Sequence, residues 1–279
     1  MNCSRLFLPF ILLLTACGGA SEDAGVDTPS SEAMPEPALI SYSVVNAYPH
    51  DTAAFTQGLE LYDGRLYEST GLVGRSSVRR TDLKTGNHDI LKQISDPYFA
   101  EGLTIFGDTA YQLTWQNKEV FVYDARTLKP IRSLPWSGDG WGIAHDSIQL
   151  YISDGTDKIY VVRPGDLKLL RVISVYDQSG PVNNLNELEF IDGQLFANRW
   201  QYDVIVRIDP VTGRVTGRMD LTGLLPRNSK QSLAYLTTPG SSAQQHGAVL
   251  NGIAWDNDRR RLLVTGKLWP HIFELKIAP

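Results

Sequence analysis

Cysteine is almost absent from this chain: Cys3 and Cys17 are the only two among 279 residues. Both stand near the N-terminus, beside the apolar run Leu6–Leu14, which is too short to span a bilayer and is typical of a secretory signal. Cleavage of that signal before Cys17 would remove Cys3. The mature chain would then have no internal disulfide and no thiol nucleophile, so its stability must come from a large hydrophobic core.

The segment Leu14-Thr15-Ala16-Cys17 ends the apolar run with the small-residue pattern of a bacterial lipobox. We therefore expect residues 1–17 to be a lipoprotein signal peptide and Cys17 to carry the lipid. The alternative is an ordinary cleaved signal with a chance cysteine. Gly18, rather than aspartate, follows the cysteine, which is typical of sorting to the outer membrane in Gram-negative bacteria. The expected location is periplasmic, with the membrane contacted only through the lipid anchor.

Basic residues are also scarce. Residues 18–38 hold five acidic residues, no basic residue and little to bury, which predicts a flexible tether before a folded domain at 39–279. Removing Arg5 with the signal leaves 25 basic against 31 acidic residues, a net charge of −6. Charges of both signs are interspersed without a basic stripe. Nucleic acid is therefore not an expected partner.

Sustained helical periodicity is missing as well. Short β-branched and aromatic runs alternate with Gly, Asp and Asn turns, which predicts strands. A strand, a tight polar turn and a second strand occur five times; aligning Gly58, Gly102, Gly142, Leu188 and Gly252 gives spacings of 44, 40, 46 and 64 residues. The long last interval contains a polar insertion at 227–246.

A second pair of strands follows each repeat except the last. Third strands are predicted at 77–82, 119–124, 158–163, 204–209 and 271–276, and fourth strands at 88–94, 130–134, 169–175 and 214–219. The fifth repeat lacks a fourth strand, while Ala38–Ala47 forms an apolar strand ahead of the first repeat. The sequence therefore predicts an all-β, five-bladed β-propeller with four-stranded blades, in which the N-terminal strand closes the last blade. A β-sandwich or an open β-structure is the alternative.

Equivalent positions of the repeat should meet at one mouth of the central channel. The residues before the aligned position are Gln57, Glu101, Trp141, Glu187 and Asn251. The ends of the following strands add Trp115, Trp200 and Lys267 near the same mouth, because a hairpin returns the chain toward its start. The repeat thus predicts a polar funnel with indole rings, although aromatic residues in propellers often serve blade packing alone.

Several short motifs resemble the glutamine cyclotransferases of plant and bacterial type. They are Phe-Thr-Gln-Gly-Leu at 55–59, Ala-Glu-Gly-Leu-Thr at 100–104, Asn-Glu-Leu-Glu at 186–189, Ala-Asn-Arg-Trp at 197–200, Leu-Asn-Gly-Ile-Ala at 250–254 and Gly-Lys-Leu-Trp-Pro at 266–270. The resemblance runs from about residue 40 to the end. It implies a five-bladed propeller without a catalytic metal that converts N-terminal glutamine of peptides to pyroglutamate and releases ammonia. The insertion at 227–246 departs from the family pattern and could reshape one rim of the site.

Carried over position by position, the resemblance implies Glu101 as the central acid and base. It also implies Gln57, Trp141, Asn186, Trp200 and Lys267 as further site residues. We expect Glu101 to move a proton from the α-amine to the leaving nitrogen and Lys267 to stabilise the oxyanion. Amide groups of Gln57 and Asn186 would grip the carboxamide, and the indoles, with Trp115, would wall the pocket. The ring positions Glu187 and Asn251 are expected to bind substrate too.

Other functions have weaker support in the sequence. The five histidines form no closely spaced ligand set, so a metal-dependent propeller lactonase is a weak alternative; no cofactor is expected. Glu101, Glu187 and Asn251 could hold a structural calcium ion, which we do not predict. A lipid-tethered binding scaffold fits the N-terminal features equally well but does not require the polar funnel. No Gly-x-Ser-x-Gly motif supports a serine hydrolase. We expect a monomer.

The predicted lipidation can be tested at Cys17. Cys17→Ser should remove the acceptor thiol, so the protein should move from the membrane fraction to the soluble fraction and lose incorporation of labelled fatty acid. Cys3→Ser, inside the predicted signal, is the matched control and should stay in the membrane fraction. Equal membrane retention and labelling of both variants would contradict the prediction.

Overall fold

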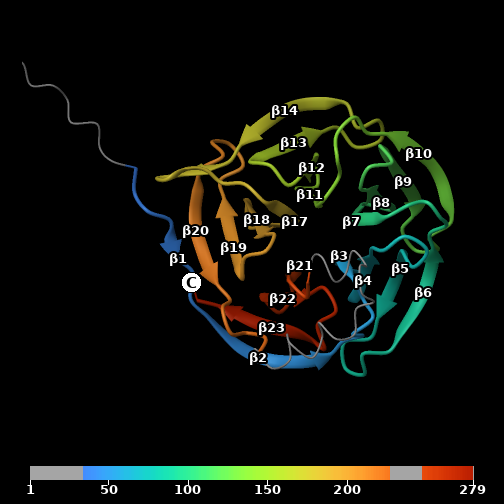
Figure 1. The fold of residues 1–279 in the computed structure, drawn as a ribbon, viewed down its shortest axis with the longest axis horizontal. Helices are drawn as coiled ribbons and strands as arrows, with labels where there is room; N and C mark the ends of the chain where they lie inside the picture. The colour runs from blue at the N-terminus through green and yellow to red at the C-terminus, as the bar shows by residue number, and fades with distance from the viewer. Residues whose placement is uncertain (1–33, 227–246, 279) are drawn as a thin grey trace, which may run out of the picture. The chain divides into compact units, whose positions relative to one another are not determined.

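The computed structural model describes residues 34–226 and 247–278, and the chain divides at Ala33 and Met34 into two units, of which the second is described here. Its strands form five blades, each with four antiparallel strands that run from an inner to an outer strand (Figure 1); a short fifth strand adds to the sheet of the fourth blade, and one two-stranded hairpin stands apart. The predicted signal peptide, Cys17, most of the tether and the insertion at 227–246 lie outside the described residues. Within the described ranges, no helix is long and apolar enough to cross a membrane.

The five blades follow one another along the chain. From the inner to the outer strand they are β3 (Thr56–Tyr62), β4 (Arg65–Thr70), β5 (Ser77–Thr81) and β6 (His88–Gln93); β7 (Ala100–Phe106), β8 (Thr109–Thr114), β9 (Glu119–Asp124) and β10 (Pro130–Pro135); β11 (Ile143–His145), β12 (Leu150–Ser153), β13 (Lys158–Val162) and β14 (Leu169–Ser174); β17 (Leu185–Ile191), β18 (Gln194–Arg199), β19 (Val204–Ile208) and β20 (Val215–Asp220); and β21 (Leu250–Asp256), β22 (Arg261–Gly266), β23 (His271–Ile277) and β2 (Tyr42–Pro49). The predicted five-bladed propeller is confirmed.

A separate hydrophobic cluster fills each interface between neighbouring blades. Between the fifth and first blades, for example, Leu59 and Leu66 pack against Ala254, Leu263 and Ile272. The middle strands are largely buried, whereas the outer strands β10 and β14 are mostly exposed and β6 is exposed or half-buried along its length. Because every blade is sandwiched between two others, five small cores replace the single core of a compact globule, and no disulfide is needed to join them.

The N-terminal strand closes the ring, as predicted, but it is divided. Residues Tyr42–Pro49 run antiparallel to β23 and complete the fifth blade. The preceding β1 (Ala38–Leu39) instead pairs in parallel with β20 of the fourth blade. Between them, Ile40 is buried in the cluster that joins these two blades, over Gly217, where a Cβ atom would lie 2.8 Å from its Cδ1. Burial of Ile40 thus explains why the predicted strand 38–47 is split, and β1 begins at the last residue assigned to the tether.

A small hairpin, β15 (Tyr176–Asp177) with β16 (Gly180–Pro181), was not predicted. It leaves the end of the third blade, and Tyr176 also bridges to Arg214 of the fourth blade. Strands of two residues carry too little hydrophobic periodicity to be recognised in a sequence.

The inner strands approach one another at backbone distance around the axis. A Cβ atom on Gly142 would lie 2.1 Å from the backbone oxygen of Asn186, and one on Gly58 would lie 2.4 Å from the backbone nitrogen of Leu103. The amide of Gly102 donates a hydrogen bond of 2.8 Å to the carbonyl of Trp141 in the next blade. Glycine is required here because any side chain would push two blades apart.

This packing predicts the effect of a single methyl group. Gly142→Ala should lower the free energy of unfolding by at least about 1–3 kcal/mol, the usual cost of overpacking, because the atom it meets is backbone. Gly64→Ala is the control. Its φ of +69° makes an alanine strained, but no atom lies within 4 Å of the added Cβ, so it tests backbone strain without overpacking. Chemical denaturation followed by tryptophan fluorescence measures both variants. A Gly142→Ala loss no larger than the Gly64→Ala loss would refute backbone contact at the axis.

Candidate active site

A cavity of about 120 Å³ opens at the end of the channel where the inner strands begin. All five blades contribute to its wall, each through the start of its inner strand, the loop after its second strand, or both. Its lining residues are Phe55, Gln57, Phe99, Glu101, Trp115, Trp141, Asn186, Trp200 and Lys267.

Glu101 is the acidic group of this cavity. It is only 5 % exposed, and among the described residues its carboxyl has no hydrogen bond or ion pair closer than 4 Å. Burial raises the pKa of Glu101 well above its usual range; the Lys267 ammonium opposes the shift and Asp139 adds to it. A carboxyl whose charged form is destabilised in this way can exchange a proton with a bound ligand.

Lys267 is the only described lysine or arginine that lines the cavity, and it too is buried. Its ammonium donates to the side-chain oxygen of Gln57 and lies 4.5 Å from the centre of the Phe55 ring. Burial lowers the pKa of Lys267 to about 8, although the nearby Glu101 raises it in part. Glu101 and Lys267 are therefore pushed in opposite directions, each toward its neutral form.

The amide of Gln57 is held on its oxygen side. Besides Lys267, the Nδ2 group of Asn251 donates to this oxygen at 3.3 Å and to the carbonyl of Thr56 at 3.0 Å. With its oxygen occupied by two donors, Gln57 has its NH₂ group left to donate to a ligand carbonyl.

Aromatic rings form the walls. The rings of Trp141 and Trp200 meet edge to face, with centroids 5.4 Å apart and planes at 88°. On the other side, the Phe99 ring meets those of Trp115 and Phe55 edge to face, with ring centroids 5.9 Å and 6.1 Å apart, respectively. These contacts give the cavity rigid apolar sides suited to the methylene groups of a ligand.

Two polar atoms of the lining are buried without a hydrogen-bond partner among the described residues: the indole nitrogen of Trp141 and the side-chain oxygen of Asn186. Leaving such groups unpaired costs about 1–3 kcal/mol each. One is a donor and the other an acceptor. A ligand with both an acceptor and a donor, such as a carboxamide, could satisfy them.

Glycines make room for the rings. A Cβ atom on Gly155 (φ +83°) would lie 2.7 Å from the Trp141 ring, and one on Gly71 would lie 2.4 Å from the Phe99 ring. Both glycines follow the second strand of a blade, so the same turn that ends the hairpin leaves space for an aromatic ring of the cavity wall.

The structure brings together seven of the nine predicted catalytic and binding residues around this cavity. Glu187 and Asn251 do not line it. Asn251 supports Gln57 from behind, through the hydrogen bond to its oxygen. The carboxyl of Glu187 accepts hydrogen bonds from the backbone amides of Leu59 at 3.2 Å and Ile253 at 2.7 Å. Glu187 therefore ties the fourth blade to the first and fifth, and its predicted contact with substrate is not supported by its position.

An offset of one residue in the fourth repeat explains why Glu187 does not line the cavity. Gly142 packs on Asn186 and Glu187, as Gly102 packs on Trp141 and Gly142. Glu187 therefore occupies the place of the glycine, and Asn186 is the residue equivalent to Trp141. The strand pairing agrees, because β17 skips from Leu185 to Leu188 where β7 skips from Ala100 to Leu103.

Phe55 and Phe99 were not predicted to line the site. Each stands two residues before a polar cavity residue, in the matching segments Phe-Thr-Gln-Gly-Leu and Phe-Ala-Glu-Gly-Leu. This repeated phenylalanine was a usable signal. Among the described residues, no three His, Cys, Asp or Glu side chains are grouped so as to hold a metal ion.

Fold and site together define a five-bladed propeller protein with a small ligand cavity on its axis, containing one acid, one lysine and two amides. The sequence profile of the glutamine cyclotransferase family matches residues 12–277. The chain is 44 % identical over 237 residues to a glutaminyl-peptide cyclotransferase of Arabidopsis thaliana, covering 84 % of this chain and 70 % of that protein. The crystal structure of the Myxococcus xanthus glutaminyl cyclase superposes with a TM-score of 0.73 at 33 % identity, covering 87 % of this chain and 98 % of that one. The chain belongs to the glutamine cyclotransferase family.

The buried lysine predicts a pH-dependent stability. The pKa of Lys267 is about 8 in the folded protein, whereas the pKa of a lysine in an unfolded chain is about 10.4. Between these values the unfolded chain binds more protons, so this group makes the protein more stable as pH rises. Lys267→Met removes the penalty of burying a charge. It should be more stable than wild type at pH 7, by up to about 3 kcal/mol, and this advantage should shrink between pH 8 and 10.

Urea denaturation at several pH values measures the effect. Lys129→Met, at an exposed position, is the control and should show no such trend. A Lys267→Met difference that stays constant from pH 7 to pH 10 would disprove the lowered pKa.

Proposed function

We propose that this protein is a glutaminyl-peptide cyclotransferase that converts N-terminal glutamine of peptides and proteins to pyroglutamate. The observation that carries the proposal is the buried Glu101 carboxyl, free of any partner among the described residues, in an indole-walled cavity beside a lysine and two amides. Membership of the glutamine cyclotransferase family supports the same reaction.

The reaction needs one proton carrier. The α-amine nitrogen attacks the γ-carboxamide carbon of the same residue, forming the lactam C–N bond, and the bond from that carbon to the amide nitrogen breaks. The attacking nitrogen loses a proton and the leaving nitrogen gains one, so that ammonia departs. We assign both transfers to Glu101, which accepts the first proton as a carboxylate and donates it as the acid. General acid–base catalysis of this type contributes about 10²–10⁴-fold.

The raised pKa of Glu101 suits this role, because the group must change protonation twice in one turnover near neutral pH. Lys267 would stabilise the negative charge that develops on the carboxamide oxygen in the tetrahedral intermediate. Its ammonium is held near the site by Gln57. The lysine must be protonated to act in this way, and the pKa of about 8 leaves it largely so at neutral pH.

The remaining cavity residues would fold the substrate for attack. Asn186 and Gln57 offer an acceptor and a donor to the carboxamide, while Trp115, Trp141 and Trp200 enclose the methylene groups. Since the reaction is intramolecular, holding the side chain back over the amine removes much of the barrier. A cavity of about 120 Å³ accommodates a single residue, which favours action on the chain terminus.

We further propose that the enzyme acts without a metal, as a monomer, and on the periplasmic side of a membrane to which Cys17 anchors it. All five blades of one chain supply the cavity, so no second subunit is required to complete it. The lipobox at 14–17 and the acidic, Pro- and Ser-rich segment after it support the tethered location.

Incubation of the purified protein with a Gln-Ala peptide tests the function. We expect a mass loss of about 17 Da, the ammonia expelled, and the rate should be unchanged by chelator if protein groups alone carry the reaction. Glu101→Gln keeps the shape of the side chain but cannot move the proton, so turnover should fall by about 10²–10⁴-fold. The Glu101→Gln protein should remain folded, since the carboxyl holds no other described residue.

Each outcome bears on a different part of the proposal. No product from the wild-type protein would exclude the cyclase and leave a binding scaffold. Activity that chelator abolishes would overturn the metal-free mechanism. Near-normal turnover by Glu101→Gln would remove Glu101 from its role.

A further inference from the structure

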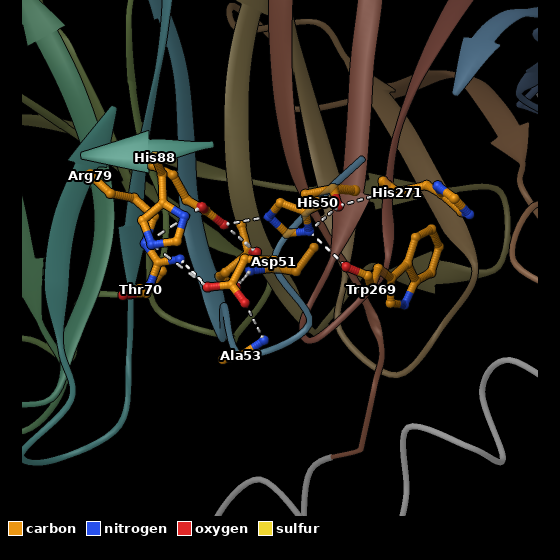
Figure 2. Close-up of polar contacts among 12 residues, drawn as sticks. His50, Asp51, Ala53, Thr70, Arg79, His88, Trp269 and His271 are labelled. Atoms are coloured by element: carbon orange, nitrogen blue, oxygen red, sulfur yellow. Dashed lines mark hydrogen bonds and ion pairs between the residues drawn. The ribbon is translucent and has the colours of Figure 1, made fainter. Parts of the chain in front are cut away.

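Behind the cavity wall lies a buried cluster of charged groups that the proposed chemistry does not use. His50 and Glu68 form its centre, with side chains 1 % exposed, and the His50 Nε2 atom lies 3.0 Å from Oε1 of Glu68. Neither residue lines the cavity. His50 follows the closing strand β2, whereas Glu68 lies in β4 of the first blade. Figure 2 shows His50 between the Trp269 backbone on one side and the charged groups around Arg79 on the other.

The hydrogen-bond geometry sets the charge of His50. Its Nδ1 atom lies 2.8 Å from the carbonyl oxygen of Trp269, and its Nε2 atom faces the Glu68 carboxyl. Thr265 also lies near Nδ1, at 3.3 Å, but its hydroxyl donates to the His271 carbonyl. Because both ring nitrogens face acceptors, both carry hydrogen and His50 is an imidazolium.

The directions in which the surroundings shift the two pKa values agree with this assignment. Burial alone would lower the pKa of His50, but the Glu68 carboxyl raises it above its usual value. Burial would likewise raise the pKa of Glu68, but His50 and Arg79 hold it below its usual range. Arg79 in turn donates to Asp51 at 2.7 Å, with its Nε 3.9 Å from Glu68. Two cations and two anions thus neutralise one another.

One arm of the cluster reaches Gln57. The Thr56 hydroxyl donates to Oε1 of Glu68 at 2.6 Å, and Thr56 is the residue directly before Gln57. The carbonyl of Thr56 accepts the side-chain N–H of Asn251, which also holds the Gln57 oxygen. Through the Thr56 hydroxyl, Glu68 thereby holds the first residue of β3 in place.

The other arm reaches Lys267. His50 holds the segment just after this lysine at two points, through its ring to the carbonyl of Trp269 and through its backbone N–H to the carbonyl of Pro270 at 2.9 Å. The two arms meet in the cavity, where the Lys267 ammonium donates to Gln57. Hydrogen bonds, together with the backbone segments 56–57 and 267–269, therefore form a closed loop that links Glu68 and His50 to both of these cavity residues.

We propose that His50 and Glu68 are a positioning pair that fixes Gln57 and Lys267 relative to each other for the cyclisation, an inference that rests on the proposed function. A buried ion pair contributes little to stability compared with apolar residues of the same volume, because desolvation offsets the attraction. Its directional hydrogen bonds can instead orient two side chains of the active site, which apolar packing does not do.

Glu68→Gln tests the pair. The glutamine can still accept the Thr56 hydroxyl but leaves His50 without an anionic partner. We expect kcat on a Gln-Ala peptide to fall by about 10- to 100-fold, as when reacting groups are displaced by a fraction of an ångström to one ångström. KM should change less than kcat, because Lys267 acts on charge that appears only in the transition state, whereas Gln57 also contacts the carboxamide in the ground state. Tyr48→Phe is the matched control: it removes a hydrogen bond of 2.7 Å from the same closing strand to Glu274, with no link to the cavity.

Thr56→Val and Thr56→Ser provide a second test if Glu68→Gln folds poorly. Valine has the shape of threonine but lacks the hydroxyl that links Glu68 to β3, while serine keeps that hydroxyl. We expect Thr56→Val to lose kcat and Thr56→Ser to retain it. Thermal midpoints of all four variants, measured beside the kinetics, separate loss of stability from loss of rate.

The inference is overturned if Glu68→Gln and Thr56→Val turn over like Tyr48→Phe and Thr56→Ser while the wild type is active. An inactive wild type would instead reject the proposed function. In that case crystal structures of the two Thr56 variants decide the inference. If the Lys267–Gln57 hydrogen bond is still present in Thr56→Val, the inference is overturned; if it is broken in Thr56→Val but present in Thr56→Ser, the inference is supported.

Discussion

The close approach of five inner strands around one axis is the constraint on which the rest of the molecule depends. At Gly58, Gly102 and Gly142 there is no room for a side chain, because the neighbouring blade presents its backbone there. This packing brings residues separated by more than 200 positions, such as Gln57 and Lys267, into one cavity. The interblade clusters then hold the ring without disulfides, since each blade buries both of its faces.

Burial gives the cavity its chemistry. The same loss of water that raises the pKa of Glu101 lowers that of Lys267, so burial disfavours the charged form of both groups in one small space. The Trp141 indole nitrogen and the Asn186 side-chain oxygen, which have no hydrogen-bond partner within residues 34–226 and 247–278, add to the cost of this arrangement. Such local costs are typical of functional sites, where the surrounding structure maintains groups that would not be stable alone.

The two kinds of buried charge in this protein differ in their partners. Glu101 has no hydrogen bond from its carboxyl among the described residues, whereas Glu68 is held by Thr56 and His50. The first arrangement leaves the carboxyl available to a ligand. The second fixes a geometry, and it does so at the point where the N-terminal strand closes the ring. Closure of the propeller and support of the cavity thus share the same residues.

The sequence alone determined the number of blades, the strand order, the closing role of the N-terminal strand and most of the cavity, because a period in the forties places equivalent residues around one axis. It could not determine local offsets. Glu187 and Asn186 are adjacent, and the packing of Gly142 decides that the asparagine lines the cavity while the glutamate binds backbone amides of the first and fifth blades. Likewise the division of the first strand depends on a space over Gly217 for Ile40. These outcomes follow from contacts between distant segments, which a repeat pattern does not encode.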